Sequence, residues 1–347
     1  MSTEKRFFGR TESGKDVYLF LIKNSSGAYI EAISYGATLK SVFMPDKNGI
    51  LRDVVLGFDD IKGHEERSDY QGQTVGRYAN RIASGRFTVN GETFDVTKNE
   101  NGETCLHGGG ELSHAVWDAE SIGENVLRFS YVSPDGSNGF PGEFTAEVTY
   151  TLTENNEIVI SYRAFCTKDT PINLTNHSYF NLGGFNCGNV LSHSLKINAS
   201  YFTPTDKKSI PTGEKRKVCG TPFDFTSFKQ IGRDIAENDE QLINCKGYDH
   251  NFCLDPVRSG EPSAEAFSPD SGIKMEMFTD MPGVQLYTGN FLSGIEGKGG
   301  TLMNKHSGFC LETQYYPDTP NKPEFPQCTF KAGEEFISRT SYKFSLI

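Results

Sequence analysis

Apolar and polar residues alternate along positions 144–153, and this alternation restricts the possible fold more than any other feature of the sequence. Every second position is apolar: Phe144, Ala146, Val148, Tyr150 and Leu152. Side chains two residues apart point to the same face of a β-strand, so the segment predicts a strand with one buried and one solvated face. A Glu-Asn-Asn turn and a second alternating run over residues 158–164 predict a β-hairpin.

Strand-like runs of the same kind recur throughout the 347 residues. A second hairpin is predicted over residues 87–96, because Asn90-Gly91 favours the positive φ angles of a type I′ turn. Helical periodicity is limited to residues 59–67 and 226–244, and residues 258–271 have the composition of a surface insertion between strands. Further strands are predicted at residues 17–23, 29–34, 38–44, 126–132, 191–197, 273–278, 284–288 and 309–315.

The order of these segments predicts the architecture. Strands do not alternate with helices, so a parallel nucleotide-binding sheet is not expected. No stretch is rich enough in Pro, Gly or Ser to divide the chain as a linker. We therefore predict an all-β protein in which residues 1–347 form a single large antiparallel β-sandwich with a few short helices.

Charge and cysteine usage limit the partners and the compartment. The formal net charge is −11, and an acidic surface repels nucleic acid phosphates and anionic lipids. Neither nucleic acid nor a membrane is therefore an expected partner, and the first residues lack the apolar segment of a signal peptide. The eight cysteines include no Cys-x-x-Cys pair, which argues against a structural zinc site or a thioredoxin-like centre. Without a secretion signal, we expect free buried thiols in a cytoplasmic protein.

Several common catalytic motifs are absent from the sequence. There is no phosphate-binding glycine loop, and the run of residues 107–110 (HGGG) has no G-x-S-x-G element that would complete an esterase site. The seven histidines form no H-E-x-x-H motif and no close pair. A metal site is therefore not expected.

A predicted strand over residues 171–182 places polar side chains on one face. Asn173, Thr175, His177 and Tyr179 alternate there with other residues. A face with so many hydrogen-bonding groups suits the floor of a polar groove better than a core layer. The alternative is a histidine that is hydrogen-bonded on a solvated face.

A second predicted strand, residues 309–316, places Glu312 on the same face as Cys310 and Gln314. A glutamate among apolar and aromatic neighbours is a catalytic carboxylate, a buried and paired one, or a solvated residue on a wet sheet face. The strand pattern leaves these alternatives open.

Four further segments contain polar groups beside glycines: residues 76–83, 104–109, 247–252 and 281–290. Each also has a purely structural interpretation. Arg77 or Arg81 could bridge strands, Asp249 could form a turn, and Gln285 could be solvated.

Together, six short segments resemble the aldose 1-epimerase (galactose mutarotase) family in order and approximate spacing. They read GRYANRIA, LHGG, NLTNHSYFNL, YDHNF, PGVQLYTGN and LETQYYPD. The blocks around His177 and Glu312 are the most specific, and the similarity runs from about Phe7 to the C-terminus.

The resemblance implies a β-sandwich with an open sugar-binding cleft and a hexose substrate. Glu312 would be the general base and His177 the general acid of anomer interconversion. It also implies that no metal is needed. No cofactor is expected, because the reaction moves no electrons or groups, and we expect a monomer or a weak homodimer. The residues that would bind the sugar or orient the catalytic pair are Asn80, Arg81, His107, Asp249 and Gln285, with Tyr179 as a further wall of the site.

These residue types suit the reaction, because a base must take the proton of the anomeric hydroxyl while an acid protonates the ring oxygen. The ordinary pKa of a glutamate is about 4.3 and that of a histidine is about 6.5. A nearby carboxylate raises the pKa of a histidine. We therefore expect Glu312 and His177 to need little adjustment of their pKa values. His107 and Arg81 would add charge or hydrogen-bond donors near the ring oxygen.

Other functions remain possible on the sequence alone. A glycoside hydrolase would use Glu312 and Asp249 as its carboxylate pair. A sugar-binding or regulatory protein could retain the fold without catalysis. An epimerase for hexose 6-phosphates would need a basic cluster, for which Arg77 and Arg81 are the candidates.

Overall fold

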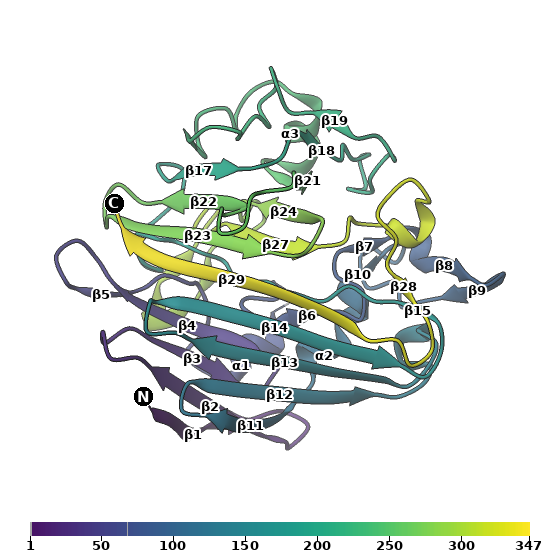
Figure 1. The fold of residues 1–347 in the computed structure, drawn as a ribbon, viewed down its shortest axis with the longest axis horizontal. Helices are drawn as coiled ribbons and strands as arrows, with labels where there is room; N and C mark the ends of the chain where they lie inside the picture. The colour runs from purple at the N-terminus through teal and green to yellow at the C-terminus, as the bar shows by residue number, and fades with distance from the viewer. Residues whose placement is uncertain (1, 68) are drawn as a thin grey trace.

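A computed structural model describes residues 2–67 and 69–347, and β-strands dominate it (Figure 1). A nine-stranded sheet forms the centre, and all its strand pairs are antiparallel. In spatial order its strands are β11 (Asp118–Gly123), β12 (Val126–Ser133), β13 (Phe144–Leu152), β14 (Glu157–Cys166), β29 (Phe336–Leu346), β23 (Ile273–Thr279), β22 (Ala264–Phe267), β17 (Ser194–Ile197) and β20 (Lys229–Gln230).

Two five-stranded sheets complete the sandwich. The first contains β1 (Ser2–Arg10), β2 (Asp16–Lys23), β3 (Tyr29–Ile33), β4 (Thr38–Pro45) and β5 (Leu51–Asp53). The second contains, in spatial order, β19 (Arg216–Lys217), β18 (Tyr201–Phe202), β21 (Asp249–Cys253), β24 (Gly283–Tyr287) and β27 (Cys310–Gln314).

Short elements connect these sheets. The α-helices of the described ranges are α1 (Ile61–Glu66), α2 (Glu111–His114) and α3 (Glu240–Cys245), and short 3₁₀ segments lie at residues 83–85, 107–110, 137–139, 298–300 and 319–321. No helix within residues 2–67 or 69–347 is long and apolar enough to cross a membrane. The two-stranded pairs are β6 (Thr74–Val75) with β16 (Thr175–Asn176), β7 (Arg81–Ile82) with β10 (Cys105–Leu106), β8 (Arg86–Val89) with β9 (Glu92–Asp95), β15 (Thr170–Pro171) with β28 (Thr329–Phe330), and β25 (Ile295–Glu296) with β26 (Leu302–Met303).

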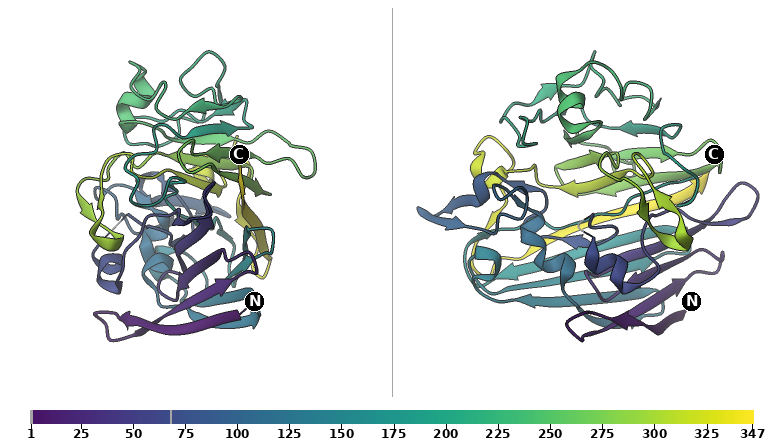
Figure 2. Two further views of the ribbon diagram at one scale, coloured as in Figure 1. Left: turned by 90° about the vertical axis from the view of Figure 1, so that its left-hand side faces the viewer. Right: turned by 180° about the vertical axis from the view of Figure 1, so that it is seen from behind.

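The core lies between the sheets. On the N-terminal side, Phe20 of β2 packs edge-on against Phe129 of β12, with ring centroids 5.9 Å apart. On the other side, the hydroxyl of Tyr342 on β29 donates to the carbonyl of Leu311 on β27 at 2.8 Å. Strand β29 lies between β14 and β23 in the large sheet, and Figure 1 shows it in yellow running across the middle of the molecule. The purple N-terminal strands and the green segment around α3 lie at opposite ends in every view (Figure 2).

The alternation in residues 144–152 is confirmed. Strand β13 alternates between buried and half-buried positions along its length and pairs with β14 as the predicted hairpin. Asn90 and Gly91 have φ angles of 51° and 81° between β8 and β9, as a type I′ turn requires. The predicted helix at residues 59–67 is also confirmed as α1, whose first turn is capped by the Asp60 side chain.

Residues 171–182 are not one continuous strand, so that prediction is wrong. They contain only β15 and β16, and then follow an irregular path with isolated bridges at Phe180. The reason is that buried asparagine side chains bond to backbone groups of neighbouring loops. Asn176 donates to the carbonyl of Gly72 at 2.7 Å, and Asn181 donates to that of Ser307 at 3.0 Å.

Two further assignments need correction. The short helix predicted within residues 226–244 is present as α3, but it begins only at Glu240, where the Asp239 side chain caps it, and β20 and turns precede it. The segment 258–271 is not entirely an insertion, since its residues 264–267 form β22 inside the large sheet. The small alanines in β22 are poor strand formers and hide this strand from the sequence pattern. All eight cysteines are free, as expected, but Cys187 and Cys219 are exposed.

Candidate active site

The pairing of β21, β24 and β27 gathers polar side chains on one face of their sheet. Gln285 of β24 lies opposite Glu312 of β27, and Asp249 of β21 lies opposite Tyr287. Directly opposed residues of neighbouring strands point to the same face, so these four side chains share it. The residues between them, such as Leu286 and Leu311, belong to the apolar core.

Loops bring the remaining groups to this face. The backbone N–H of His177 donates to the carbonyl of Gln73, and the N–H of Gly72 donates to that of His177, both at 2.9 Å. Arg81 lies opposite Leu106 in the β7–β10 pair. The neighbours of these two residues along the chain, Asn80 and His107, therefore also lie close together. A Cβ on Gly108 would lie 2.1 Å from the carbonyl oxygen of Gly76, so only glycine allows this close approach.

The result is a cleft of about 230 Å³, and seven of the eight predicted site residues line it. The eighth, Gln285, is buried beside the cleft and donates from Nε2 to Oδ1 of Asp249 at 2.8 Å. The cleft is lined by Asp69, Tyr70, Asn80, Arg81, Glu100, Leu106, His107, His177, Tyr179, Asp249, Tyr287, Phe291 and Glu312.

Glu100 is a lining residue that sequence reasoning missed. Its two carboxylate oxygens accept from Nε and Nη2 of Arg81 at 2.9 and 2.8 Å. The guanidinium also lies 3.8 Å from Oδ2 of Asp249, so two carboxylates hold it in place. Glu100 lies in an irregular turn without strand periodicity, which offers no sequence signal, whereas Tyr287 could have been found because it shares a strand face with Gln285.

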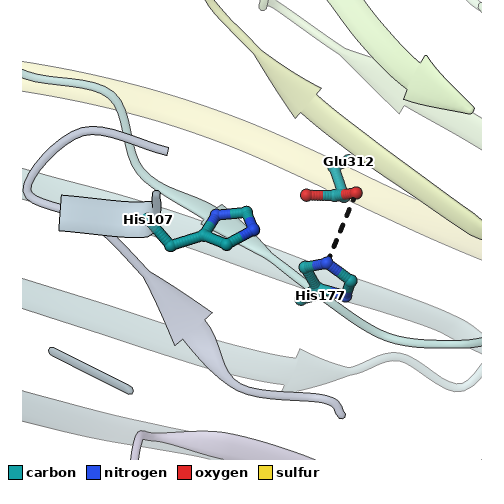
Figure 3. Close-up of side chains that lie close together, drawn as sticks. All are labelled: His107, His177 and Glu312. Carbon is teal, nitrogen blue, oxygen red and sulfur yellow. Dashed lines mark ion pairs between the residues drawn. The ribbon is translucent and has the colours of Figure 1, made fainter. Parts of the chain in front are cut away.

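Glu312 and His177 lie next to each other in the lining of the cleft (Figure 3). Nε2 of His177 lies 3.6 Å from Oε1 of Glu312, and both side chains are almost completely buried. Oε2 of Glu312 is also buried and has no hydrogen-bond partner among the described residues. A buried carboxylate oxygen without a partner is unfavourable, so this environment disfavours the ionised form of Glu312.

The pKa values of this pair differ from the expectation of little adjustment. Burial raises the pKa of Glu312 well above its ordinary value, the charge of Asp249 adds to this rise, and Arg81 opposes it. Burial lowers the pKa of His177 to about 4. Removal from water disfavours both charged forms, so a proton shared by the pair is favoured on Glu312.

His107 is fixed as a neutral hydrogen-bond donor. Its Nδ1 accepts the backbone N–H of Asn80 at 3.2 Å, so Nε2 must carry the hydrogen. Burial lowers the pKa of His107 well below its ordinary value, and the neighbouring His177 and Arg81 lower it further. His107 and Arg81 were both expected to supply charge or hydrogen-bond donors near the ring oxygen. Because His107 is neutral, Arg81 supplies the positive charge and His107 supplies only a donor.

His107, His177 and Glu312 also form a cluster whose possible metal-ligand atoms all lie within 4.8 Å of one another (Figure 3). The fold thus creates a histidine pair that the sequence spacing did not reveal. Metal ligation through Nε2 of His107 would place a hydrogen on Nδ1, against the N–H of Asn80. The hydrogen bonding of the cluster therefore favours a substrate site over a metal site.

Arg77 lies outside the cleft. Its guanidinium donates to Ser133 and to the carbonyls of Pro134 and Gly142 within the protein, and the side chain is fully buried. Arg77 therefore has a structural role, and one of the two arginines considered for phosphate binding is not available.

The chain is similar to known sugar epimerases. The family model described as aldose 1-epimerase matches residues 18–343. The chain is 42% identical to galactose mutarotase from Bos taurus over all of this chain and 99% of that protein. It is 37% identical to aldose 1-epimerase from Escherichia coli, covering 95% of this chain and 96% of that protein.

Solved structures give the same result. The aldose epimerase homologue from C. elegans has a TM-score of 0.87 and 31% identity, covering 94% of this chain and 98% of that one. Galactose 1-epimerase from Lactobacillus acidophilus also has a TM-score of 0.87, with 27% identity over 99% of both chains. This chain belongs to the aldose 1-epimerase family.

Proposed function

We propose that this protein interconverts the α and β anomers of free aldohexoses such as galactose and glucose, with Glu312 as general base and His177 as general acid. The approach of Oε1 of Glu312 to within 3.6 Å of Nε2 of His177, in the lining of one cleft, carries this proposal. Drug-sized ligands occupy pockets of roughly 300–1,000 Å³. A cleft of about 230 Å³ suits a smaller ligand such as a monosaccharide.

The reaction needs only proton transfers. Glu312 accepts the proton of the O1 hydroxyl, the C1–O5 bond breaks, and O5 receives a proton from Nε2 of His177. The open-chain aldehyde rotates about C1–C2, and closure then reverses both transfers on the opposite face of C1. No electrons or groups are transferred, so the balance requires no co-reactant.

The shifted pKa values make each group a stronger reagent in its reactive form. A carboxylate with a raised pKa is a stronger base, and an imidazolium with a lowered pKa is a stronger acid. The drawback is that the reactive ion pair is a minor form of the buried pair. Sugar hydroxyls that donate to Glu312 would stabilise its ionised form, so substrate binding itself would favour the reactive state.

The other lining residues would hold the sugar. Nε2–H of His107 and the guanidinium of Arg81 are donors for ring or hydroxyl oxygens, and Asn80 adds an amide. Asp249, oriented by Gln285, would accept from sugar hydroxyls. Tyr179 would form a wall of the site.

A phosphorylated sugar fits the cleft less well than a neutral one. Besides Glu312, which holds the proton of the buried pair, the lining contains Asp69, Glu100 and Asp249 but a single arginine, Arg81, which Glu100 already pairs. A phosphate would meet net negative charge there. We therefore favour free hexoses over hexose 6-phosphates.

The test is polarimetry of freshly dissolved α-galactose, α-glucose and α-glucose 6-phosphate. We expect accelerated mutarotation of the free sugars and little effect on the phosphate. Release of nitrophenol from aryl glycosides would instead indicate a glycoside hydrolase. Absence of any acceleration above the spontaneous rate would contradict the proposal and favour a sugar-binding protein.

We also infer a cytoplasmic location, because the eight cysteines form no disulfide and free thiols are typical of reducing compartments. The expectation of a monomer or weak homodimer stays a prediction, which sedimentation analysis would test.

A further inference from the structure

His177 contacts the same strand through both of its ring nitrogens. Cys310 precedes Glu312 by two residues on β27, so the two side chains share the cleft-facing side of that strand. Nε2 of His177 lies 3.6 Å from Oε1 of Glu312, and Nδ1 lies 3.6 Å from Sγ of Cys310. The thiol is completely buried.

The Cys310 thiol stays neutral. Burial raises its pKa well above the ordinary value, and the negative charges of Glu312 and Asp249 raise it further. A neutral thiol can accept a hydrogen bond at sulfur. Within the described parts of the chain, it is the only side-chain hydrogen-bond partner of Nδ1.

The proton cycle of the proposed function requires Nδ1 to keep its hydrogen. When His177 is the general acid, both ring nitrogens are protonated. After Nε2 has given its proton away and Glu312 is protonated, the carboxyl can donate to Nε2 only if Nδ1 carries the remaining ring hydrogen. An acceptor at Nδ1 is therefore needed at every step.

We propose that Cys310 is a positioning residue whose sulfur accepts the Nδ1–H of His177 and thereby keeps the mobile proton on Nε2, between Glu312 and the sugar ring oxygen. This inference rests on the proposed function of the pair. It assigns a role to a buried thiol that neither touches the sugar nor titrates.

A thiol has an advantage over a carboxylate in this position. A carboxylate at Nδ1 would stabilise the imidazolium and raise the pKa of His177, whereas sulfur is a weak and uncharged acceptor. The other titratable side chains around the ring are Tyr70, His107, Tyr179 and Tyr287. None of these four side chains makes a hydrogen bond to Nδ1 in the described structure. Among the described residues, Glu312 is the only carboxylate that lies within 4 Å of a ring nitrogen of His177.

The first test observes the tautomer directly in the wild-type protein. Nitrogen-15 NMR of histidine-labelled protein distinguishes protonated from unprotonated ring nitrogens, and the His177→Asn variant assigns the signals. We expect Nδ1 of neutral His177 to be protonated and Nε2 to be unprotonated. An unprotonated Nδ1 would overturn the inference. Because this measurement needs no substrate, its failure is distinguishable from an absence of mutarotase activity.

The second test uses variants of Cys310. We expect Cys310→Ala to lower kcat about tenfold, as loss of one hydrogen bond predicts, with an unchanged KM and mixed His177 tautomers. Cys310→Ser should have the wild-type kcat and the wild-type tautomer of His177, since the serine hydroxyl oxygen can also accept the hydrogen bond from Nδ1. Cys166→Ala is the matched control, because this buried thiol of β14 bonds to the carbonyl of Pro141 and does not line the cleft.

Two results would contradict the role of Cys310. One is a Cys310→Ala protein with wild-type kcat and a single protonated Nδ1. The other is a folded Cys310→Ser protein as slow as the alanine variant. If the alanine variant does not fold, the serine variant and the wild-type spectrum still decide the question.

Discussion

Replacing Glu312 by glutamine should separate catalysis from stability. The amide has the same shape but cannot accept the O1 proton. No neighbour can substitute, because Asp249 is already bonded to Gln285 and lies beside Arg81. Removal of a general base typically lowers the rate by about 10²–10⁴-fold, which corresponds to about 3–5 kcal/mol of activation free energy. Sugar binding should remain largely intact.

The same substitution should increase the free energy of unfolding at neutral pH. The pKa of Glu312 is raised in the folded protein, so the folded state holds this proton more tightly than the unfolded state does. As pH rises above the ordinary pKa of a glutamate, the unfolded chain ionises first and the folded protein loses relative stability. Glutamine removes this loss, and the difference between variant and wild type should vanish below about pH 4.

The assays are polarimetry for turnover, calorimetric titration with galactose for binding, and urea unfolding at pH 4 and pH 7 for stability. Glu276→Gln is a matched control, since Glu276 is paired with Lys274 on β23, away from the cleft. A Glu312→Gln protein with near-normal turnover would refute the assignment of the base. A variant that is less stable than wild type at pH 7 would refute the argument from desolvation.

Three further substitutions test other parts of the structure. His177→Asn should lower kcat by about 10²–10⁴-fold in polarimetry, and a loss of only a fewfold would point to His107 as the acid. Gly108→Ala should reduce the free energy of unfolding by about 1–3 kcal/mol and impair turnover, because Gly108 has a φ of 66° and a Cβ there would meet the carbonyl of Gly76. A variant with the wild-type free energy of unfolding and wild-type turnover would contradict this. Lys298→Met should reduce the free energy of unfolding by about 3–5 kcal/mol, since it leaves Asp53 buried without its partner at 2.7 Å, and an unchanged urea midpoint would show that the pair is not important.

The strands with clear alternation could be predicted from sequence because burial alternates with the same period. This holds for β13 and for β27, where the alternation correctly placed Cys310, Glu312 and Gln314 on one face. Prediction from alternation fails where side-chain hydrogen bonds or neighbouring strands determine the path of the backbone. Residues 177–182 follow asparagine side-chain bonds, and β22 is a strand through its neighbours rather than through its alanines.

The site could be predicted residue by residue only through the family resemblance. Spacing alone could not bring His107 next to His177, because they come from loops 70 residues apart that the β7–β10 and β6–β16 pairs join. Glu100 was missed because its role is a contact with Arg81, which no periodicity records. The pKa directions were also missed, since they depend on burial that only the folded chain defines.

In the proposed reaction Glu312 acts on O1 and His177 acts on O5 of the same hexose. A crystal structure of the Glu312→Gln variant with galactose tests it most directly. We expect the side chain of residue 312 to lie within hydrogen-bonding distance of O1, and Nε2 of His177 within hydrogen-bonding distance of O5. A sugar bound with C1 turned away from these two groups, or bound outside their cleft, would contradict it.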